Sequence, residues 1–197
     1  MKRSRLLVVG LAALLALGAG LIARRASTPF AASPASGVGG RFSLIDQDGR
    51  TVDERLLRGH WSVVFFGYTS CPDVCPTTLT ALGQAVLAIR NAEDRPRVVF
   101  ITVDPERDTP AQLKLYLASP AFPKGVLGLT GSPARIAAAA KAYRVYFRKV
   151  PDGPTYSMDH TSVVYLMDPE GRFSRPLDMT APPGGVARQI SAALKVG

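Results

Sequence analysis

The sequence lacks a run of basic residues interleaved with aromatic side chains, and it has no internal repeat. The first absence argues against nucleic-acid binding. The formal net charge of +9 does not restore that interpretation, because five of the 24 basic residues precede residue 26 and the first acidic residue is Asp46. The rest of the chain carries 19 basic and 15 acidic residues. Such a modest excess is ordinary for a soluble domain or for one that meets an acidic partner.

Cysteine and histidine are also scarce, with two residues of each. Both cysteines fall in one stretch, Cys71-Pro-Asp-Val-Cys75, with three residues between them rather than the two of the usual redox motif. Two thiols at this spacing can close into a disulfide or offer two soft sulfur ligands to a metal ion. Two thiolates alone leave a metal under-coordinated, so a metal site needs a third ligand. The candidates of the strongest type are His60 and His160.

Residues 1–25 are predicted to form a membrane anchor. An uncharged apolar run from Leu6 to Ala23 follows three basic residues, and its length approaches the ~20 residues of a bilayer span. A cleaved signal peptide is the alternative, but its apolar region is shorter, and Arg24-Arg25 after the run makes a poor cleavage site. Under either interpretation the basic N-terminus stays in the cytoplasm and the larger body crosses. We therefore expect a single-pass protein of the cell inner membrane whose soluble domain lies on the periplasmic side.

Residues 26–39 are rich in Ser, Ala, Pro and Gly, which predicts a flexible linker before a folded domain over residues 40–197. In that domain, apolar runs typical of buried strands alternate with segments whose apolar residues recur at helical spacing. Strands are expected in a hairpin around Asp48-Gly49 and at 61–67, 97–103, 144–150, 161–167 and 172–175. Helices are expected to begin at Pro76, Thr109 and Ser132, and a last helix to bury Val186, Ile190 and Leu194. This alternation predicts an α/β fold with a mixed sheet.

The cysteine loop falls between a predicted strand and a predicted helix, a common position for a functional site. Cys75 is expected at or just before the first helical turn, where unpaired N–H groups and the helix dipole favour a thiolate. A thiolate serves both disulfide exchange and metal binding, so this position leaves both chemistries open. On a helical turn, positions i and i+4 face the same side, so Cys71 and Cys75 can converge on one ion.

The two histidines differ in where the predicted strands place them. His60 precedes the strand at 61–67, at the end opposite the cysteines, and is expected to be an exposed loop residue. His160 immediately precedes the strand at 161–167. It can approach the cysteine loop only if that strand runs antiparallel beside the strand at 61–67.

Three segments in series, FGYTSCPDVCP, VDPERDTP and SMDHTSVVYLMDPEGRF, resemble the Sco (SenC/PrrC) family. Members of that family are membrane-tethered, thioredoxin-like proteins that help to assemble the copper A centre of cytochrome c oxidase. The resemblance covers about residue 40 to the C-terminus, together with the anchor. It implies a thioredoxin-like fold with helices on both faces of the sheet. It also implies that Cys71, Cys75 and His160 bind copper, as Cu(I) or Cu(II), and that Asp159 supports this ligand shell.

The resemblance implies a copper metallochaperone whose acceptor is cytochrome c oxidase subunit II. Two thiolates and one imidazole suit three-coordinate Cu(I), whereas zinc would require a fourth ligand. Other partners it implies are a second copper chaperone and a thioredoxin-like reductant. The alternative is a thiol-disulfide oxidoreductase in which Cys71 and Cys75 form the redox-active pair and reduce the acceptor's cysteines. A copper or redox sensor is a third interpretation that the sequence does not separate from the first.

Several residues near the motifs have two interpretations each. The loop residues Asp104, Arg107 and Asp108 either support the site or only cap the connection between a strand and a helix. Met158 is expected to pack rather than to lend its thioether. Four basic residues are expected to form a solvated face, with docking to an acidic patch as the alternative: Lys141, Arg144, Arg148 and Lys149. Three neighbouring aromatic residues are expected in the core: Tyr143, Tyr146 and Phe147.

Overall fold

The structure is a computed structural model that describes residues 37–195. The predicted anchor, residues 1–25, and nearly all of the predicted linker, residues 26–39, lie outside the described residues. Between residues 37 and 195, no helix is long and apolar enough to cross a bilayer.

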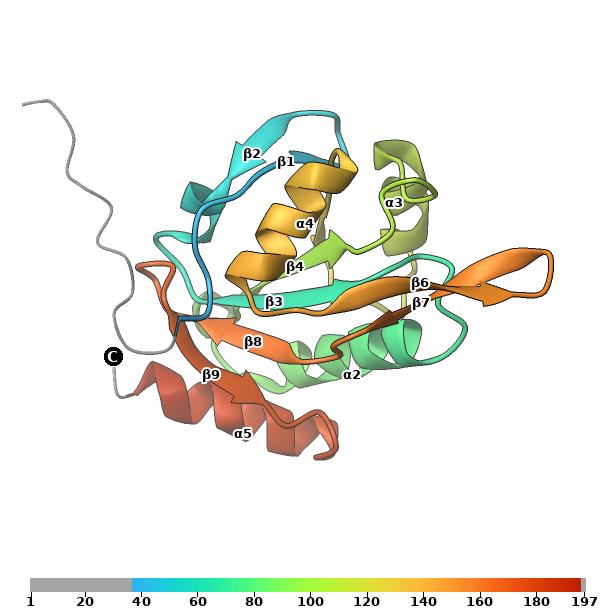
Figure 1. Ribbon diagram of the computed structural model, residues 1–197. Coiled ribbons are helices and arrows are strands. Elements are labelled where there is room, and N and C mark those ends of the chain that lie inside the picture. The colour runs from blue at the N-terminus through green and yellow to red at the C-terminus, as the bar shows by residue number, and fades with distance from the viewer. Residues whose placement is uncertain (1–36, 196–197) are drawn as a thin grey trace, which may run out of the picture. The chain divides into compact units, whose positions relative to one another are not determined.

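A seven-stranded mixed sheet forms the centre of the domain, in the order β2-β1-β5-β4-β3-β8-β9 (Figure 1). Strands β3, β4 and β5 run parallel to one another, and the remaining neighbours pair antiparallel. All six residues of β3 are buried, as the continuous apolar run predicted. The strands are β1 (Ser43–Asp46), β2 (Thr51–Asp53), β3 (Ser62–Gly67), β4 (Arg97–Thr102), β5 (Leu127–Thr130), β8 (Val164–Met167) and β9 (Phe173–Leu177).

Helices cover both faces of this sheet, as predicted. Figure 1 shows α4 on one side and the pair α2 and α5 on the other. Short 3₁₀ helices, η1 (Glu54–Leu57) and η2 (Ala92–Asp94), lie in two connections. The α-helices are α2 (Val74–Ala88), α3 (Pro110–Leu117), α4 (Pro133–Ala142) and α5 (Pro183–Leu194).

Two of the predicted helix starts are confirmed in their capping contacts. The hydroxyl of Thr109 accepts a hydrogen bond from Gln112 N–H at 3.2 Å, and that of Ser132 accepts one from Arg135 N–H at 3.3 Å. Each cap is followed by proline at the first helical position, where its missing N–H costs nothing. Helix α2 starts at Val74, two residues before the predicted start.

Strand β5 was not predicted. Its sequence, Leu-Gly-Leu-Thr, is short and contains a glycine, so it lacks the β-branched signal of a strand. A Cβ at Gly128 would lie 2.5 Å from Cδ1 of Leu117, on α3, so any larger residue would have to displace that side chain. The glycine thus allows α3 to pack closely on β5, and local sequence does not reveal this contact between the two elements.

A separate two-stranded hairpin follows α4 and extends away from the sheet (Figure 1). Its strands are β6 (Phe147–Asp152) and β7 (Thr155–His160). The strand expected at 144–150 therefore starts three residues later, after Arg144, which has a positive φ of 56°. The strand expected at 161–167 begins at Val164 instead. Strand β7 was missed, and His160 is its last residue.

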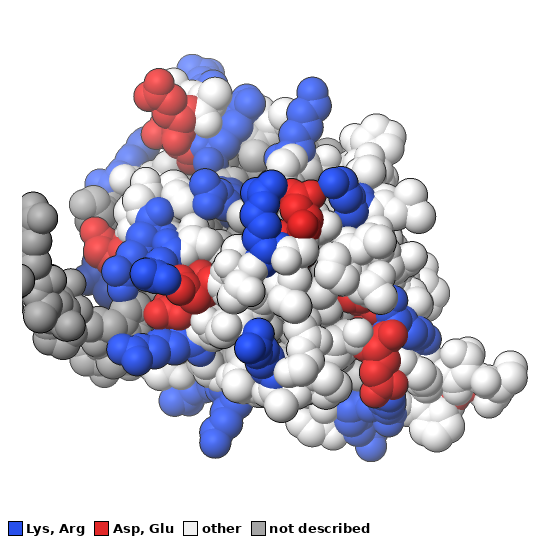
Figure 2. Space-filling model, turned by 90° about the horizontal axis from the view of Figure 1, so that it is seen from above, with Lys and Arg blue, Asp and Glu red and all other residues white. Residues whose placement is uncertain are grey.

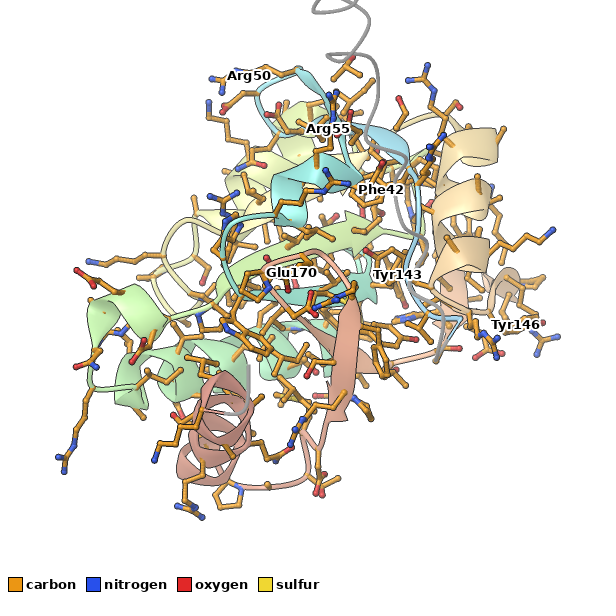
Figure 3. All side chains as sticks on the ribbon, turned by 90° about the vertical axis from the view of Figure 1, so that its left-hand side faces the viewer. Phe42, Arg50, Arg55, Tyr143, Tyr146 and Glu170 are labelled. Carbon is orange, nitrogen blue, oxygen red and sulfur yellow. The ribbon has the colours of Figure 1, made fainter. Side chains whose placement is uncertain are left out.

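The aromatic residues before the hairpin divide between core and surface. Tyr143 is fully buried and its ring centroid lies 5.4 Å from that of Phe66. Phe147 is half-buried. Tyr146, expected in the core, is 58% exposed and stands at the outer edge of the domain in Figure 3. It sits in the connection from the end of α4 to the start of β6, which leads into the separate hairpin.

Candidate metal centre

The cysteine loop leaves the carboxyl end of β3 at Gly67 and enters α2 at Val74. A Cβ on Gly67 would lie 2.9 Å from the sulfur of Cys75 and 2.8 Å from the ring of Phe100. The Cys75 sulfur therefore rests directly against the last residue of the central strand.

Both cysteines are free thiols, and they differ in exposure: Cys71 is partly exposed and Cys75 is buried. Cys71 precedes α2, whereas Cys75 lies in its first turn. The Cys75 N–H donates a hydrogen bond to the Cys71 sulfur at 3.4 Å. The Cys71 sulfur thus meets the backbone of Cys75 at the start of the helix, but Cys71 itself lies before α2, so the two cysteines do not share a helical turn as the i, i+4 argument assumed.

The expectation that the helix start favours a thiolate is wrong for Cys75. Burial raises the pKa of the Cys75 thiol far above its usual range, because a buried anion loses its hydration. The N–H of this first turn points at the Cys71 sulfur instead. Cys75 is therefore a neutral thiol in the metal-free protein, and a bound cation would have to displace its proton.

His160 reaches the cysteines from the end of β7. Its Nε2 lies 3.9 Å from the sulfur of Cys75. The condition set by the sequence is met, because β8 runs antiparallel to β3 with Val164 opposite Phe65. Residues 161–163 therefore lie next to the cysteine loop. The side chains from two distant segments converge at one end of the sheet.

The protonation of His160 suits a ligand. Its Nδ1 lies 3.1 Å from the carbonyl oxygen of Thr161. A carbonyl only accepts, so Nδ1 carries the proton of the neutral ring, and the lone pair of Nε2 faces Cys75. Burial lowers the pKa of His160, so the ring is neutral at pH 7.

The spacing of the donor atoms allows one ion to be shared. Zinc forms bonds of ~2.3 Å to sulfur and ~2.0–2.1 Å to nitrogen. With these bond lengths and a sulfur–metal–nitrogen angle of ~120°, the sulfur and the nitrogen lie ~3.8 Å apart. The observed 3.9 Å between Cys75 and His160 is close to that value. In the described part of the chain, however, no three His, Cys, Asp or Glu side chains already form a metal site. Cys71 or its neighbours must therefore adjust on binding.

A pocket of about 260 Å³ opens beside Cys71 and His160, whereas buried Cys75 does not line it. Its lining includes Tyr68, Cys71, Val74, Met158 and His160. Met158 is otherwise buried, in line with the predicted packing role. A larger pocket of about 470 Å³ lies between the end of α2 and α5, but neither a thiol nor an imidazole lines it.

The remaining candidate residues lie outside this cluster. Asp159 is exposed and its carboxylate pairs with Arg148 at 3.1 Å, and the contact that orients His160 comes from Thr161 instead. His60 precedes β3, at the end opposite the cysteines, as predicted. It is half-buried rather than exposed, and burial lowers its pKa.

The basic cluster is largely paired rather than free. Arg148 contacts Asp159, Lys149 contacts Glu106, and Arg144 donates to the carbonyl of Gly37 at 2.9 Å. On the face shown in Figure 2, Lys and Arg are scattered among Asp and Glu rather than gathered into one patch. The expected solvated face agrees with this distribution.

Comparisons with known proteins show the family to which the chain belongs. The SCO1/SenC family model matches residues 31–195, which is most of the chain. This chain belongs to the SCO1/SenC family. The mitochondrial SCO1 homolog 1 of Arabidopsis thaliana is 42% identical over 159 residues, which cover 78% of this chain and 47% of that protein. The chain therefore spans about half the length of this relative.

Solved structures of SCO1/SenC members share the fold. ScoI of Bradyrhizobium japonicum with copper bound is 44% identical, with a TM-score of 0.72 over 79% of this chain and 99% of that one. BsSco, a Sco-family cytochrome c oxidase assembly protein with a disulfide switch, is 26% identical, with a TM-score of 0.65 over 84% of this chain and 98% of that one. The predicted mixed α/β sheet of a thioredoxin-like Sco protein is thus confirmed for the described domain.

Proposed function

We propose that this SCO1/SenC protein is a copper metallochaperone that binds copper through Cys71, Cys75 and His160. It delivers copper to the copper A centre of cytochrome c oxidase, and subunit II is the acceptor. Family membership and the copper-bound ScoI relative at 44% identity support this proposal.

The observation that carries it is the contact between Cys75 and His160. These residues are 85 positions apart, and yet sulfur and Nε2 lie 3.9 Å from each other. A thiol-disulfide exchange reaction needs no imidazole lone pair at this place. A copper site does, because two thiolates and one neutral imidazole complete a three-coordinate Cu(I) shell.

The difference in exposure between the cysteines suits transfer. Buried Cys75 and half-buried His160 form the inner side of the shell, and partly exposed Cys71 faces the pocket. A thiolate of the acceptor can enter on the Cys71 side before the other ligands leave. Exchange of one ligand at a time keeps the ion coordinated throughout.

The N-terminal sequence supports a proposal for the cell compartment. We propose that residues 1–25 anchor the chain in the inner membrane and that residues 26–39 tether the domain on the periplasmic side. Copper would reach the protein from another copper chaperone, and a thioredoxin-like reductant would keep Cys71 and Cys75 reduced, since only free thiolates bind metal.

The second candidate function is a thiol-disulfide reductase, and the exposure of Cys71 beside buried Cys75 favours it. The Cys71 thiolate would attack a disulfide of the acceptor and release one acceptor thiol. Cys75 would then displace the second, so that the acceptor gains two thiols and Cys71–Cys75 becomes a disulfide. Metal binding and this reaction use the same thiols, so the two functions can coexist.

Copper titration of the reduced full-length protein in detergent, followed by transfer to a purified copper A domain, tests the proposal. His160→Ala is the test variant and His60→Ala the matched control, because His60 lies at the far end of β3. We expect copper affinity and transfer to fall in His160→Ala alone. Equal copper retention by both variants would remove His160 from the ligand shell. Fast reduction of the acceptor's disulfide by His160→Ala, with normal oxidase assembly, would favour the reductase.

A further inference from the structure

The loop Asp104–Asp108 joins β4 to α3 and touches both segments that carry the proposed ligands. One of its ends contacts the cysteine loop, and its middle contacts the β6–β7 hairpin. Neither contact involves Cys71, Cys75 or His160 directly.

Asp108 holds the cysteine loop. Its side chain is fully buried. The carboxylate accepts hydrogen bonds from the N–H of Thr69 at 3.0 Å, the hydroxyl of Thr69 at 2.6 Å and the hydroxyl of Thr102 at 2.6 Å. Thr69 lies two residues before Cys71, so these bonds fix the start of the loop to the end of β4.

Asp104 and Arg107 hold the hairpin at Tyr156. The buried carboxylate of Asp104 pairs with Arg107 and accepts a hydrogen bond from the Tyr156 hydroxyl at 2.8 Å. Arg107 also donates to the carbonyl of Tyr156 at 2.9 Å, and its guanidinium lies 3.9 Å from the centre of the Tyr156 ring. Tyr156 is four residues before His160 on the same strand.

Tyr68, in the cysteine loop, contacts both Arg107 of the loop Asp104–Asp108 and His160 of the hairpin. Its ring lies 5.8 Å from the Arg107 guanidinium. It also meets the ring of His160 edge to face, with centroids 5.9 Å apart and planes at 85°. Arg107 thus lies between Tyr68, in the cysteine loop, and Tyr156, on the hairpin.

We propose that the loop Asp104–Asp108 positions both halves of the copper site and so sets the distance between the cysteines and His160. Asp104, Arg107 and Asp108 act as positioning residues. The proposal rests on the proposed function. Its physical reason is that a lone two-stranded hairpin is marginally stable in water, and among the strands of residues 37–195 β6 and β7 pair only with each other. Without the tie at Tyr156, the end of β7 that carries His160 keeps its pairing with β6 and its packing through Met158 and Tyr68, but it loses its hydrogen bonds to the loop.

Four variants separate positioning from general stability. Arg107→Gln removes the ion pair and the ring contact, whereas Tyr156→Phe removes only the hydroxyl that reaches Asp104 and is the milder change. Thr69→Val removes one bond to Asp108, and Thr69→Ser retains the hydroxyl. The matched control is Arg55→Gln, at a residue far from the loop and labelled in Figure 3. This change breaks the exposed ion pair of Arg55 with Asp53.

Two measurements on the full-length protein test the proposal: amide hydrogen exchange without metal, and Cu(I) affinity by chelator competition. In Arg107→Gln and Tyr156→Phe we expect faster exchange over residues 155–160 and unchanged exchange in β3. In these two variants and Thr69→Val, copper affinity should fall by about tenfold, the lower end for residues that support ligands. Thr69→Ser and Arg55→Gln should match the wild type.

Three outcomes would overturn the proposal. In Arg107→Gln and Tyr156→Phe, hydrogen exchange in the hairpin could be unchanged, or it could accelerate equally in the hairpin and in β3. The third outcome is that Arg107→Gln, Tyr156→Phe and Thr69→Val bind copper as tightly as Arg55→Gln. If the wild type itself binds no copper, the proposed function fails. Exchange in the hairpin, measured without metal, then still decides whether the loop fixes the strand that carries His160.

Discussion

Gly67 and the sulfur of Cys75 lie so close that a single added carbon does not fit between them. A Cβ at Gly67 would stand 2.9 Å from that sulfur and 2.8 Å from the ring of Phe100. The last residue of the central strand therefore limits where the Cys75 thiol can sit. The limit comes from packing, since φ at Gly67 is not in the left-handed region.

The first prediction concerns Gly67→Ala. The methyl group must displace Cys75, Phe100 or the strand, and such overpacking costs about 1–3 kcal/mol. We expect a lower free energy of unfolding and less copper bound per chain, measured by urea unfolding and metal analysis. Gly184→Ala is the control, because at that helical position the nearest atom would lie 3.8 Å away. Equal unfolding free energies in both variants would contradict the packing argument.

The second prediction concerns reactivity toward alkylating agents. Cys71 is partly exposed, whereas Cys75 is buried and burial raises the pKa of its thiol. Since the thiolate is the nucleophile, iodoacetamide should label Cys71 in the native metal-free protein and leave Cys75 unmodified until denaturant is added. Peptide mass spectrometry of the wild type and of Cys71→Ser measures this. Labelling of both cysteines at similar rates would show that Cys75 is accessible.

The third prediction is a loss of stability of the metal-free protein as the pH falls. Burial lowers the pKa of both His60 and His160 in the folded state. The unfolded chain, with an ordinary histidine pKa of ~6.5, then binds more protons below that pH, so stability is fully present above ~6.5 and declines below it. Each histidine contributes a slope of at most ~1.4 kcal/mol per pH unit.

Urea unfolding between pH 5 and 7.5 checks that sign. His60→Gln and His160→Gln should each reduce the slope of the unfolding free energy, and the double variant should remove most of it. Most carboxylates titrate below this range. Burial raises the pKa of Asp108, which gives a slope of the opposite sign because the folded state then binds more protons than the unfolded chain. A slope that persists in the double variant would assign the pH dependence to other groups.

Sequence patterning was sufficient where one element decides its own structure. The buried run Ser62–Gly67 and the capped starts at Thr109 and Ser132 are examples. It was insufficient where packing between distant segments decides. Strand β5 exists because it pairs with β4 and β1, and α3 packs closely on its Gly128. Strand β7 exists because it pairs with β6, with Phe147 opposite His160.

The same division holds for the candidate site. Spacing and motif order named Cys71, Cys75 and His160, but they did not give the register of β8 beside β3 that brings His160 to the cysteines. Nor did they give the buried state of Cys75, where loss of hydration outweighs the helix start. The contacts of Asp108 with Thr69 join residues 39 positions apart, and sequence left that loop with two interpretations.

The fourth prediction is proton release on copper binding. The Cys75 thiol is protonated at neutral pH because burial raises its pKa, whereas burial lowers the pKa of His160 and leaves its Nε2 free. Binding must therefore expel the Cys75 proton and none from His160. Cu(I) titration in weakly buffered solution at pH 7.5, followed by a pH indicator, should show at least one proton released per copper.

His160→Ala should weaken copper binding without changing the number of protons released per bound copper, and His60→Ala should change neither the copper affinity nor the number of protons released. Copper binding without proton release would mean that Cys75 keeps its proton and is not a thiolate ligand.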